Sequence, residues 1–248
     1  MIRKQIPNML TLCNLICGVL AVYMASRGLL HRAAALMVAG IMFDFVDGFA
    51  ARLLKVSSPM GKELDSLADV VTSGVVPAII LYSIYRMSRY GFGFAQPIYW
   101  LRFVAFLMPA FAAYRLAKFN LDDRQGHSFL GFPVPSNALI WAAIGTCVVH
   151  PDWAQLAVIP IRSVQHILIS DAGLVVLAVV SLITDVLMVS ELPLMSLKFT
   201  SCGWKENWTK YVLLLGAAVL IVLFGILGIA FAILWYILLS LLTRRCNA

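Results

Sequence analysis

The stretch IMFDFVDGFAARLLKVSSPMGKELDSLADVVTSG, residues 41–74, decides the fold, because it sets four aspartates into two apolar runs. Asp44 and Asp47 stand three residues apart, and Asp65 and Asp69 stand four apart. If both runs are helices, each pair lies on one helix face. An ionised aspartate at the centre of a membrane helix costs at least about 2.5–3.5 kcal/mol, so we interpret all four as functional residues.

The composition indicates that these runs lie in a membrane. Of the 248 residues, 62% are hydrophobic and 12% are charged, and the mean hydropathy is +0.91, far above a soluble domain. We predict an all-α fold, a polytopic transmembrane helical bundle. The expected helices cover residues 9–26, 33–54, 65–85, 98–117, 136–150 and 172–190, and a longer apolar run covers residues 211–242.

The last apolar run is too long for one crossing. As a single helix it would extend about 48 Å, whereas the hydrocarbon core of a bilayer is about 30 Å thick. We split it near residues 225–228 into two helices, which gives eight crossings; one kinked helix is the alternative. With the N-terminus in the cytoplasm, 13 of the 19 Lys and Arg residues then fall on the inner side, as the positive-inside rule expects.

These spans predict a single domain in the cell (inner) membrane. We expect a transmembrane core over residues 1–195, then a cytoplasmic loop and a C-terminal helical hairpin over residues 196–248. The net charge of +7 does not predict a nucleic-acid partner, because the basic residues are scattered between apolar segments; membrane lipid explains them better. The five cysteines include no CxxC pair, so no zinc site is indicated.

The two aspartate pairs are expected to meet at the cytoplasmic end of the bundle, because the turn over residues 54–64 is short. Four carboxylates brought together repel one another, so without a bound cation at least some of them would have to be protonated. Mg²⁺ or Mn²⁺ fits better than Zn²⁺, since no Cys or His accompanies the cluster. The alternative is that the aspartates only form ion pairs with Arg52, Lys55 and Lys62.

Smaller residues in the same stretch fit a phosphate substrate. Gly48 and Ala51 leave room beside the helix backbone, and Arg52 offers a forked donor suited to phosphate. Gly61 relaxes the turn, and Ser58 supplies a hydroxyl beside it. Together with the aspartates, these residues predict a two-metal site for a pyrophosphate.

The pattern Asp44-x2-Asp47-Gly48-x2-Ala51-Arg52-x8-Gly61-x3-Asp65-x3-Asp69 resembles the motif of the CDP-alcohol phosphotransferases. The resemblance implies a six-helix catalytic core, commonly homodimeric, that holds two divalent cations against the CDP pyrophosphate. It makes Asp44, Asp47 and Asp65 metal ligands. Asp69 would lie near the second metal and act as the general base, and the CDP-lipid would contact residues of the motif and of the first helix, namely Gly48, Ala51, Arg52, Ser58, Gly61, Asn8 and Thr11.

Three further segments resemble the phosphatidylserine synthase branch of that family. They are PNMLTLCNLICG at residues 7–18, RLAKFN with FLGFPVPSNA at residues 115–138, and VSELPLMSLKF at residues 189–199. The implied reaction joins CDP-diacylglycerol and L-serine to give phosphatidylserine and CMP. The alternatives are the same chemistry on glycerol 3-phosphate or inositol phosphate and, more distantly, a cation transporter, which would carry acidic residues in both halves of the chain.

The acceptor is expected near the end of the fourth helix, where Arg115, Lys118 and Asn120 stand. Arg115 would bind the serine carboxylate bidentately, although ordinary positive-inside placement also explains these residues. Asn8, Thr11 and Asn14 in the first helix would hydrogen-bond either the nucleotide or neighbouring helices.

Overall fold

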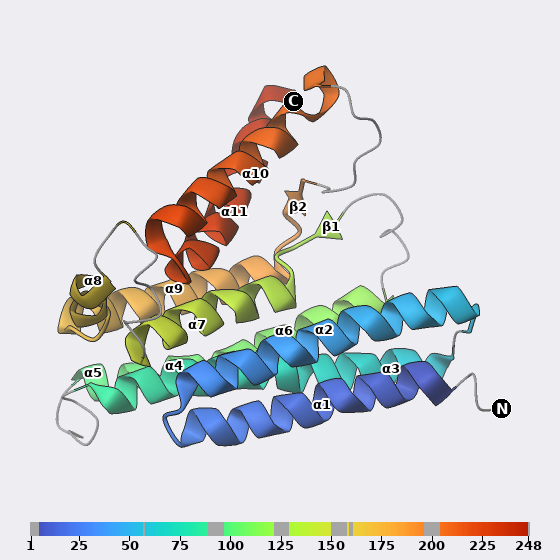
Figure 1. Cartoon of the computed structure of the whole chain (residues 1–248), viewed down its shortest axis with the longest axis horizontal. Coiled ribbons are helices and arrows are strands. Elements are labelled where there is room, and N and C mark those ends of the chain that lie inside the picture. The colour runs from blue at the N-terminus through green and yellow to red at the C-terminus, as the bar shows by residue number, and fades with distance from the viewer. Residues whose placement is uncertain are drawn as a thin grey trace.

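The computed structural model describes residues 5–56, 58–88, 97–121, 129–149, 158, 161–195 and 204–247. It confirms the all-α bundle (Figure 1). Within the described residues, six helices are long and apolar enough to cross a membrane, and two shorter apolar helices cover Val134–Val149 and Leu227–Thr243. The protein is therefore a multi-pass membrane protein, with an apolar helix at each of the eight predicted places.

The N-terminal half forms four long helical segments. They are α1 (Gln5–Ser26), α2 (Leu30–Leu54), the continuous segment α3 (Pro59–Asp69), η2 (Val70–Val75) and α4 (Val76–Met87), and the continuous segment α5 (Pro97–Leu101), η3 (Arg102–Phe106) and α6 (Leu107–Leu121). The segment η2 is π-helical and η3 is a 3₁₀ turn. The helix α1 packs along α2 and also contacts α3, η2 and α4, so it supports both aspartate-bearing helices, α2 and α3.

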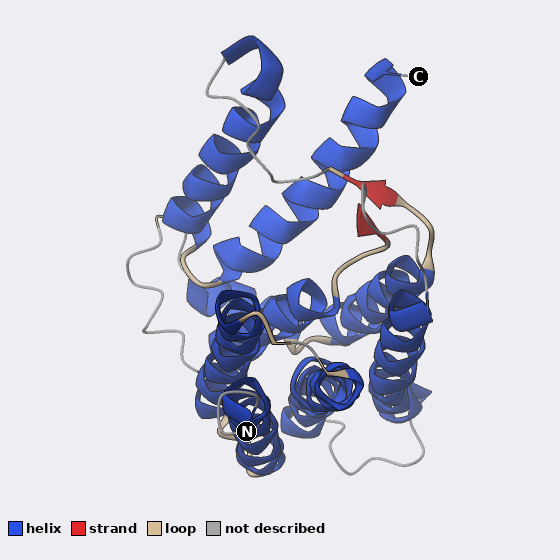
Figure 2. Cartoon of the chain, turned by 90° about the vertical axis from the view of Figure 1, so that its right-hand side faces the viewer, coloured by secondary structure: helices blue, strands red, loops and turns tan. Residues whose placement is uncertain are grey.

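The C-terminal half completes the bundle and adds a hairpin. It consists of β1 (Phe129–Leu130), α7 (Val134–Val149), α8 (Ile161–Leu168), α9 (Asp171–Val189), β2 (Pro193–Leu194), α10 (Trp204–Phe224) and α11 (Leu227–Asn247). The two strands pair antiparallel, with Phe129 opposite Leu194. In the hairpin α10–α11, it is α11 that contacts α7 of the bundle. Figures 1 and 2 show the hairpin leaving the bundle at an angle.

The break between α10 and α11 falls where the sequence predicted it. Gly225 has φ +59, a left-handed conformation that glycine adopts at little cost, and α11 begins two residues later. The alternative of one kinked terminal helix is therefore wrong. The predicted loop that begins at residue 196 lies outside the described residues as far as residue 203.

The structure also corrects parts of the predicted element pattern. The helix α10 begins at Trp204, seven residues before the predicted start at residue 211. The third segment begins at Pro59, six residues earlier than predicted, because Ser58 caps it and a proline fits its first turn. Residues 161–168, expected to be loop, form α8. The paired strands β1 and β2 were not predicted.

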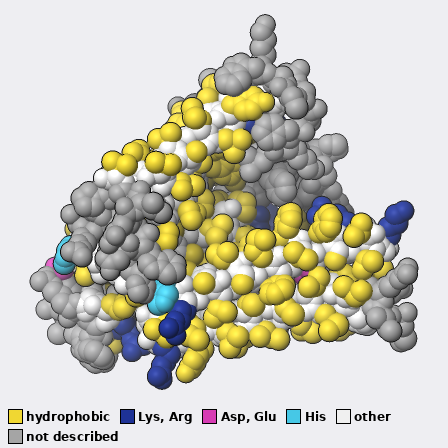
Figure 3. All heavy atoms as spheres, in the orientation of Figure 1, with side chains coloured by type: hydrophobic (Ala, Val, Ile, Leu, Met, Phe, Trp, Pro, Cys, Tyr) yellow, Lys and Arg dark blue, Asp and Glu magenta, His cyan; other side chains and the backbone are white. Residues whose placement is uncertain are grey.

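Apolar side chains fill the core between the helices and also cover much of the outer surface of the bundle. Large buried side chains such as Met37, Leu81 and Trp141 fill the space between α2, α4 and α7. Large apolar side chains also face outward on the long helices, including Phe45 on α2 and Val222 on α10. Figure 3 shows this apolar outer surface, with Lys and Arg gathered toward the ends of the long helices, the distribution expected of lipid-facing helices.

Candidate active site at the α2–α3 turn

A tight turn reverses the chain between the two aspartate pairs. At the end of α2, Lys55 adopts a left-handed conformation, and its N–H bonds to the carbonyl of Arg52 at 3.2 Å. Ser58 then begins α3 by accepting a hydrogen bond from the Gly61 N–H at 3.0 Å. Because only the chain from Lys55 to Ser58 separates the helices, Asp65 returns beside Asp44 and Asp47.

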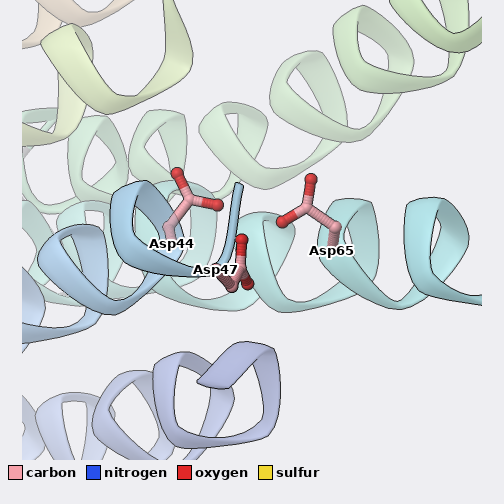
Figure 4. A group of neighbouring side chains, drawn as sticks. All are labelled: Asp44, Asp47 and Asp65. Carbon is pink, nitrogen blue, oxygen red and sulfur yellow. The ribbon is translucent and has the colours of Figure 1, made fainter. Parts of the chain in front are cut away.

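Three of the four aspartates form one cluster. Asp44, Asp47 and Asp65 each offer a carboxylate oxygen, and these oxygens all lie within 4.8 Å of one another. Figure 4 shows Asp44 and Asp65 turned toward each other, with Asp47 between them. Among the described residues, none of the three forms an ion pair with Lys or Arg, since Arg52 instead donates to the Gly48 carbonyl at 3.0 Å and Lys62 to the Asn120 carbonyl at 2.9 Å. The ion-pair alternative is therefore wrong for the described residues.

The cluster fits a hard divalent cation. Oδ1 of Asp65 is buried and has no hydrogen-bond donor among the described residues. All the clustered donors are carboxylate oxygens, the ligands that Mg²⁺ and Mn²⁺ prefer. Oxygens on opposite sides of one Mg²⁺ lie roughly 4.2 Å apart, so small carboxylate rotations would bring these atoms into range.

Asp69 is not part of this group of three. It lies one helical turn beyond Asp65, is only 9% exposed, and accepts a hydrogen bond from Asn14 Nδ2 at 3.3 Å. Its carboxylate lies beside that of Asp44. The structure thus brings all four aspartates into one neighbourhood, with three clustered oxygens and a fourth carboxylate oriented by α1.

The polar residues of α1 face these carboxylates. Thr11 donates a hydrogen bond to Asp47, as Asn14 does to Asp69. The sequence left open whether the polar residues of α1 bond the nucleotide or neighbouring helices. The described hydrogen bonds of Thr11 to Asp47 and of Asn14 to Asp69 are with neighbouring helices. Asn8 lies one turn earlier, beside the cavity described next.

A cavity of about 510 Å³ opens beside the carboxylates. Gly48 borders open space, because a Cβ added there would meet nothing within 4 Å. Lys55, Val56, Lys62 and Pro7 also line the cavity and were not singled out as binding residues; only the basic character of the turn hinted at the two lysines. The remaining lining residues are two of the aspartates and all seven predicted CDP-lipid residues: Asp47, Asp65, Asn8, Thr11, Gly48, Ala51, Arg52, Ser58 and Gly61.

The three predicted acceptor residues lie in different surroundings. Arg115 is half-buried and close enough to Asp69 for their opposite charges to interact, and its Nε has no acceptor among the described residues. Lys118 forms a surface ion pair with Glu191 at 3.0 Å. Asn120 joins α6 to α3. Of the three, Arg115 is the one whose charge interacts with a motif aspartate, Asp69.

Asn120 belongs to a closed set of hydrogen bonds, here called the α3–α6 link. Lys62 Nζ donates to the Asn120 carbonyl at 2.9 Å, Asn120 Nδ2 donates to Ser66 Oγ at 2.8 Å, and Ser66 Oγ donates to the Lys62 carbonyl at 3.2 Å. Since Lys62 lines the cavity and Ser66 follows Asp65, the link fixes the end of α6 against the helix that carries the carboxylates.

Comparison with known proteins places this site in a family context. Residues 4–178 match the family described as CDP-alcohol phosphatidyltransferase. The chain is 36% identical over 159 residues to the CDP-diacylglycerol–serine O-phosphatidyltransferase of Bacillus subtilis, which covers 58% of this chain and 83% of that protein. These matches confirm the resemblance read from the aspartate motif.

Two further relatives carry the same name. The Helicobacter pylori (strain J99) protein is 36% identical over 138 residues, 54% of this chain and 54% of the relative. The Methanocaldococcus jannaschii protein is 34% identical over 148 residues, 59% of this chain and 63% of the relative. The chain thus spans somewhat more than half the length of these two proteins.

The α3–α6 link predicts that Ser66 and Asn120 stabilise the fold jointly. Ser66→Ala and Asn120→Ala should each lower the free energy of unfolding by about 0.5–1.5 kcal/mol, because each removes the same partly buried hydrogen bond. The double variant should then lose less than the sum of the two losses. Denaturant unfolding in mild detergent, followed by circular dichroism, measures this.

Ser190→Ala serves as the matched control, since its hydroxyl bonds to its own helix at Leu187. Its loss should add to that of Asn120→Ala. Strict additivity between Ser66→Ala and Asn120→Ala would show that the link contributes nothing.

Proposed function

Because this chain belongs to the CDP-alcohol phosphatidyltransferase family, we propose that it transfers the phosphatidyl group of CDP-diacylglycerol to the hydroxyl of L-serine, giving phosphatidylserine and CMP. The observation that carries the proposal is the carboxylate cluster beside a cavity lined by every predicted CDP-lipid residue. The serine acceptor is supported by the names of the relatives.

In this proposal the cavity binds the CDP-lipid through its diphosphate. Asp44, Asp47 and Asp65 hold divalent cations, with Asp69 near the second of two. When bound, Mg²⁺ or Mn²⁺ neutralises charge on the diphosphate and on the departing CMP. Arg52, Lys55 and Lys62, which all line the cavity, attract the phosphate oxygens, while the open space at Gly48 admits the substrate close to the backbone of α2.

Asp69 is proposed as the general base. The serine hydroxyl oxygen forms a bond to the phosphorus that carries diacylglycerol, the bond from that phosphorus to CMP breaks, and the hydroxyl proton moves to Asp69. Asn14 orients the receiving carboxylate by its hydrogen bond. Arg115, on the α6 side of Asp69, binds the serine carboxylate and so presents the hydroxyl to the base.

The setting of the enzyme follows from the same reasoning. We place the site on the cytoplasmic side of the cell membrane, which the basic residues around the α2–α3 turn support. In this proposal the catalytic core is residues 1–195, and the loop with the appended hairpin is residues 196–248; the family match, over residues 4–178, lies within that core. A homodimer is proposed from the family resemblance.

The acceptor is tested by supplying the purified enzyme with CDP-diacylglycerol, Mn²⁺ and one labelled alcohol at a time. L-serine should release CMP and give labelled phosphatidylserine, whereas glycerol 3-phosphate and inositol phosphate should not react. Chelation of the cation should stop the reaction. Reaction of glycerol 3-phosphate but not serine would overturn the acceptor, and failure to release CMP with any alcohol would favour a cation transporter.

Asp69→Asn should lower turnover by roughly 10²–10⁴-fold, because the hydroxyl loses its proton acceptor. CDP-lipid binding, measured by the same protein's affinity for labelled CDP-diacylglycerol, should change little. Asp171→Asn, at the start of α9, makes the same chemical change outside the site and should keep turnover. Near-normal turnover of Asp69→Asn would remove it as the base.

Arg115→Ala should raise the apparent KM for serine roughly tenfold to a hundredfold, with a much smaller effect on the CDP-lipid. Arg115→Lys should lie between the wild type and Arg115→Ala, since it keeps the charge but loses the forked geometry. Steady-state kinetics with each substrate varied in turn measure both effects. An equal rise for both substrates would contradict a carboxylate-binding role.

A further inference from the structure

A second, smaller cavity lies at the opposite end of the bundle. It has a volume of about 260 Å³ and is lined by Ser26, Arg27, Gly28, Ser83, Arg86 and Met87. It therefore forms where the turn between α1 and α2 meets the end of α4. Along α1, Ser26 is 18 residues from Asn8 in the first cavity, or about 27 Å. The two cavities thus open at the two ends of a helix long enough to cross a membrane.

The charges in this cavity are not balanced. The first cavity sets its basic residues against Asp47 and Asp65, whereas none of the described residues that line the second cavity is acidic. Arg27 and Arg86 are both exposed, and neither forms an ion pair with another described residue. Arg86 donates to the Ser26 carbonyl through one long bond of 3.4 Å, and its other N–H donors have no acceptor among the described residues.

The hydroxyl groups of the two serines in this cavity already donate to backbone carbonyls, so the arginines are the groups able to donate hydrogen bonds to a ligand. Ser83 Oγ donates to the Ala25 carbonyl at 2.8 Å, and Ser26 Oγ donates to the Tyr23 carbonyl at 2.8 Å. Each hydroxyl proton is thus already used. Two arginines that line one cavity, with no carboxylate among its described lining residues, are suited to a phosphate group, which accepts their paired N–H donors.

An exposed apolar face of α1 leads away from the cavity. Toward the start of α1 from Ser26, apolar residues recur at spacings of three or four and so share the face of Ser26; they are Tyr23, Val19, Ile16 and Leu12. Their exposed fractions are 56%, 55%, 57% and 44%. This face extends about 21 Å from Ser26 toward the other end of the helix. A ligand with a phosphate at one end and a hydrocarbon chain at the other would match both features.

We propose that this cavity binds the phosphate of an anionic phospholipid whose acyl chain lies along the exposed face of α1. The site is separate from the proposed catalytic cavity and lies at the other membrane surface. Its occupant is a lipid of the surrounding bilayer. Arg27 and Arg86 hold the headgroup, and Tyr23, Val19 and Ile16 contact the chain.

The test counts bound lipids on delipidated protein by native mass spectrometry, with phosphatidylglycerol or phosphatidylcholine added in detergent. The double variant Arg27→Ala/Arg86→Ala should bind one phosphatidylglycerol about thirtyfold more weakly than the wild type, because two basic contacts are lost. Phosphatidylcholine binding should be the same in both. Lipid that enters the catalytic cavity affects both proteins equally and cancels in the comparison.

Arg32→Ala is the matched control, since Arg32 is an exposed arginine near the start of α2 that does not line the cavity. It should change phosphatidylglycerol binding less than threefold if recognition is local, in keeping with a surface charge worth under ~1 kcal/mol. Equal weakening by Arg32→Ala would overturn the site in favour of general attraction to anionic lipid. Unchanged binding by the double variant would also overturn it.

Inorganic phosphate distinguishes the two sources of the phosphate group. Millimolar phosphate should not raise the melting temperature of the wild type, because it cannot use the apolar face of α1. A rise that the double variant lacks would overturn the lipid as occupant and assign the cavity to free phosphate. None of these measurements depends on turnover, so they stand apart from the test of the transferase.

Discussion

The main constraint on the site is that the fold must hold three mutually repelling carboxylates, those of Asp44, Asp47 and Asp65, close together. If all three were ionised, two unit charges 4.8 Å apart would repel by about 3.5 kcal/mol at an effective dielectric constant of about 20, and the cluster holds three such pairs. No described Lys or Arg forms an ion pair with any of them. Packing must therefore hold the carboxylates in place against their repulsion, and binding of divalent cations would relieve it.

That packing comes largely from close contact between α1, α2 and the π-helical turn η2. A Cβ at Gly40 would stand 2.8 Å from both Asn14 Oδ1 and Thr72 Cγ2, so only glycine lets α2 approach so closely. Thr72 in turn donates to the Asn14 carbonyl at 3.2 Å. These contacts fix Asn14 beneath Asp69. The π-helical turn directly after Asp69 widens the helix at this point, a feature often found at functional sites.

Much of this arrangement could be predicted from the sequence, because its signals are local. Apolar runs mark the helices, Gly225 marks the hairpin turn, and the cost of an aspartate in a membrane marks the motif. The start of α3 was predicted six residues late, although Ser58 and Pro59 carried a capping signal that the apolar pattern obscured. The strands and the α3–α6 link join residues more than fifty positions apart, and no local pattern reports such partners.

The contrast between local signals and contacts of distant residues also applies to the two proposed binding sites, that of the CDP-lipid and that of the acceptor. The cavity for the CDP-lipid is built from α1, α2 and α3, so the residues that line it come from two short stretches of the chain and form a compact motif. Arg115 comes from α6 and approaches Asp69 from another helix. Asp69 lies where the two sets meet. In the proposed reaction, a substitution at Arg115 would change the contacts of the acceptor and leave in place the residues that form the carboxylate cluster. A motif can then identify the family, while the proposed choice of acceptor depends on contacts between distant helices.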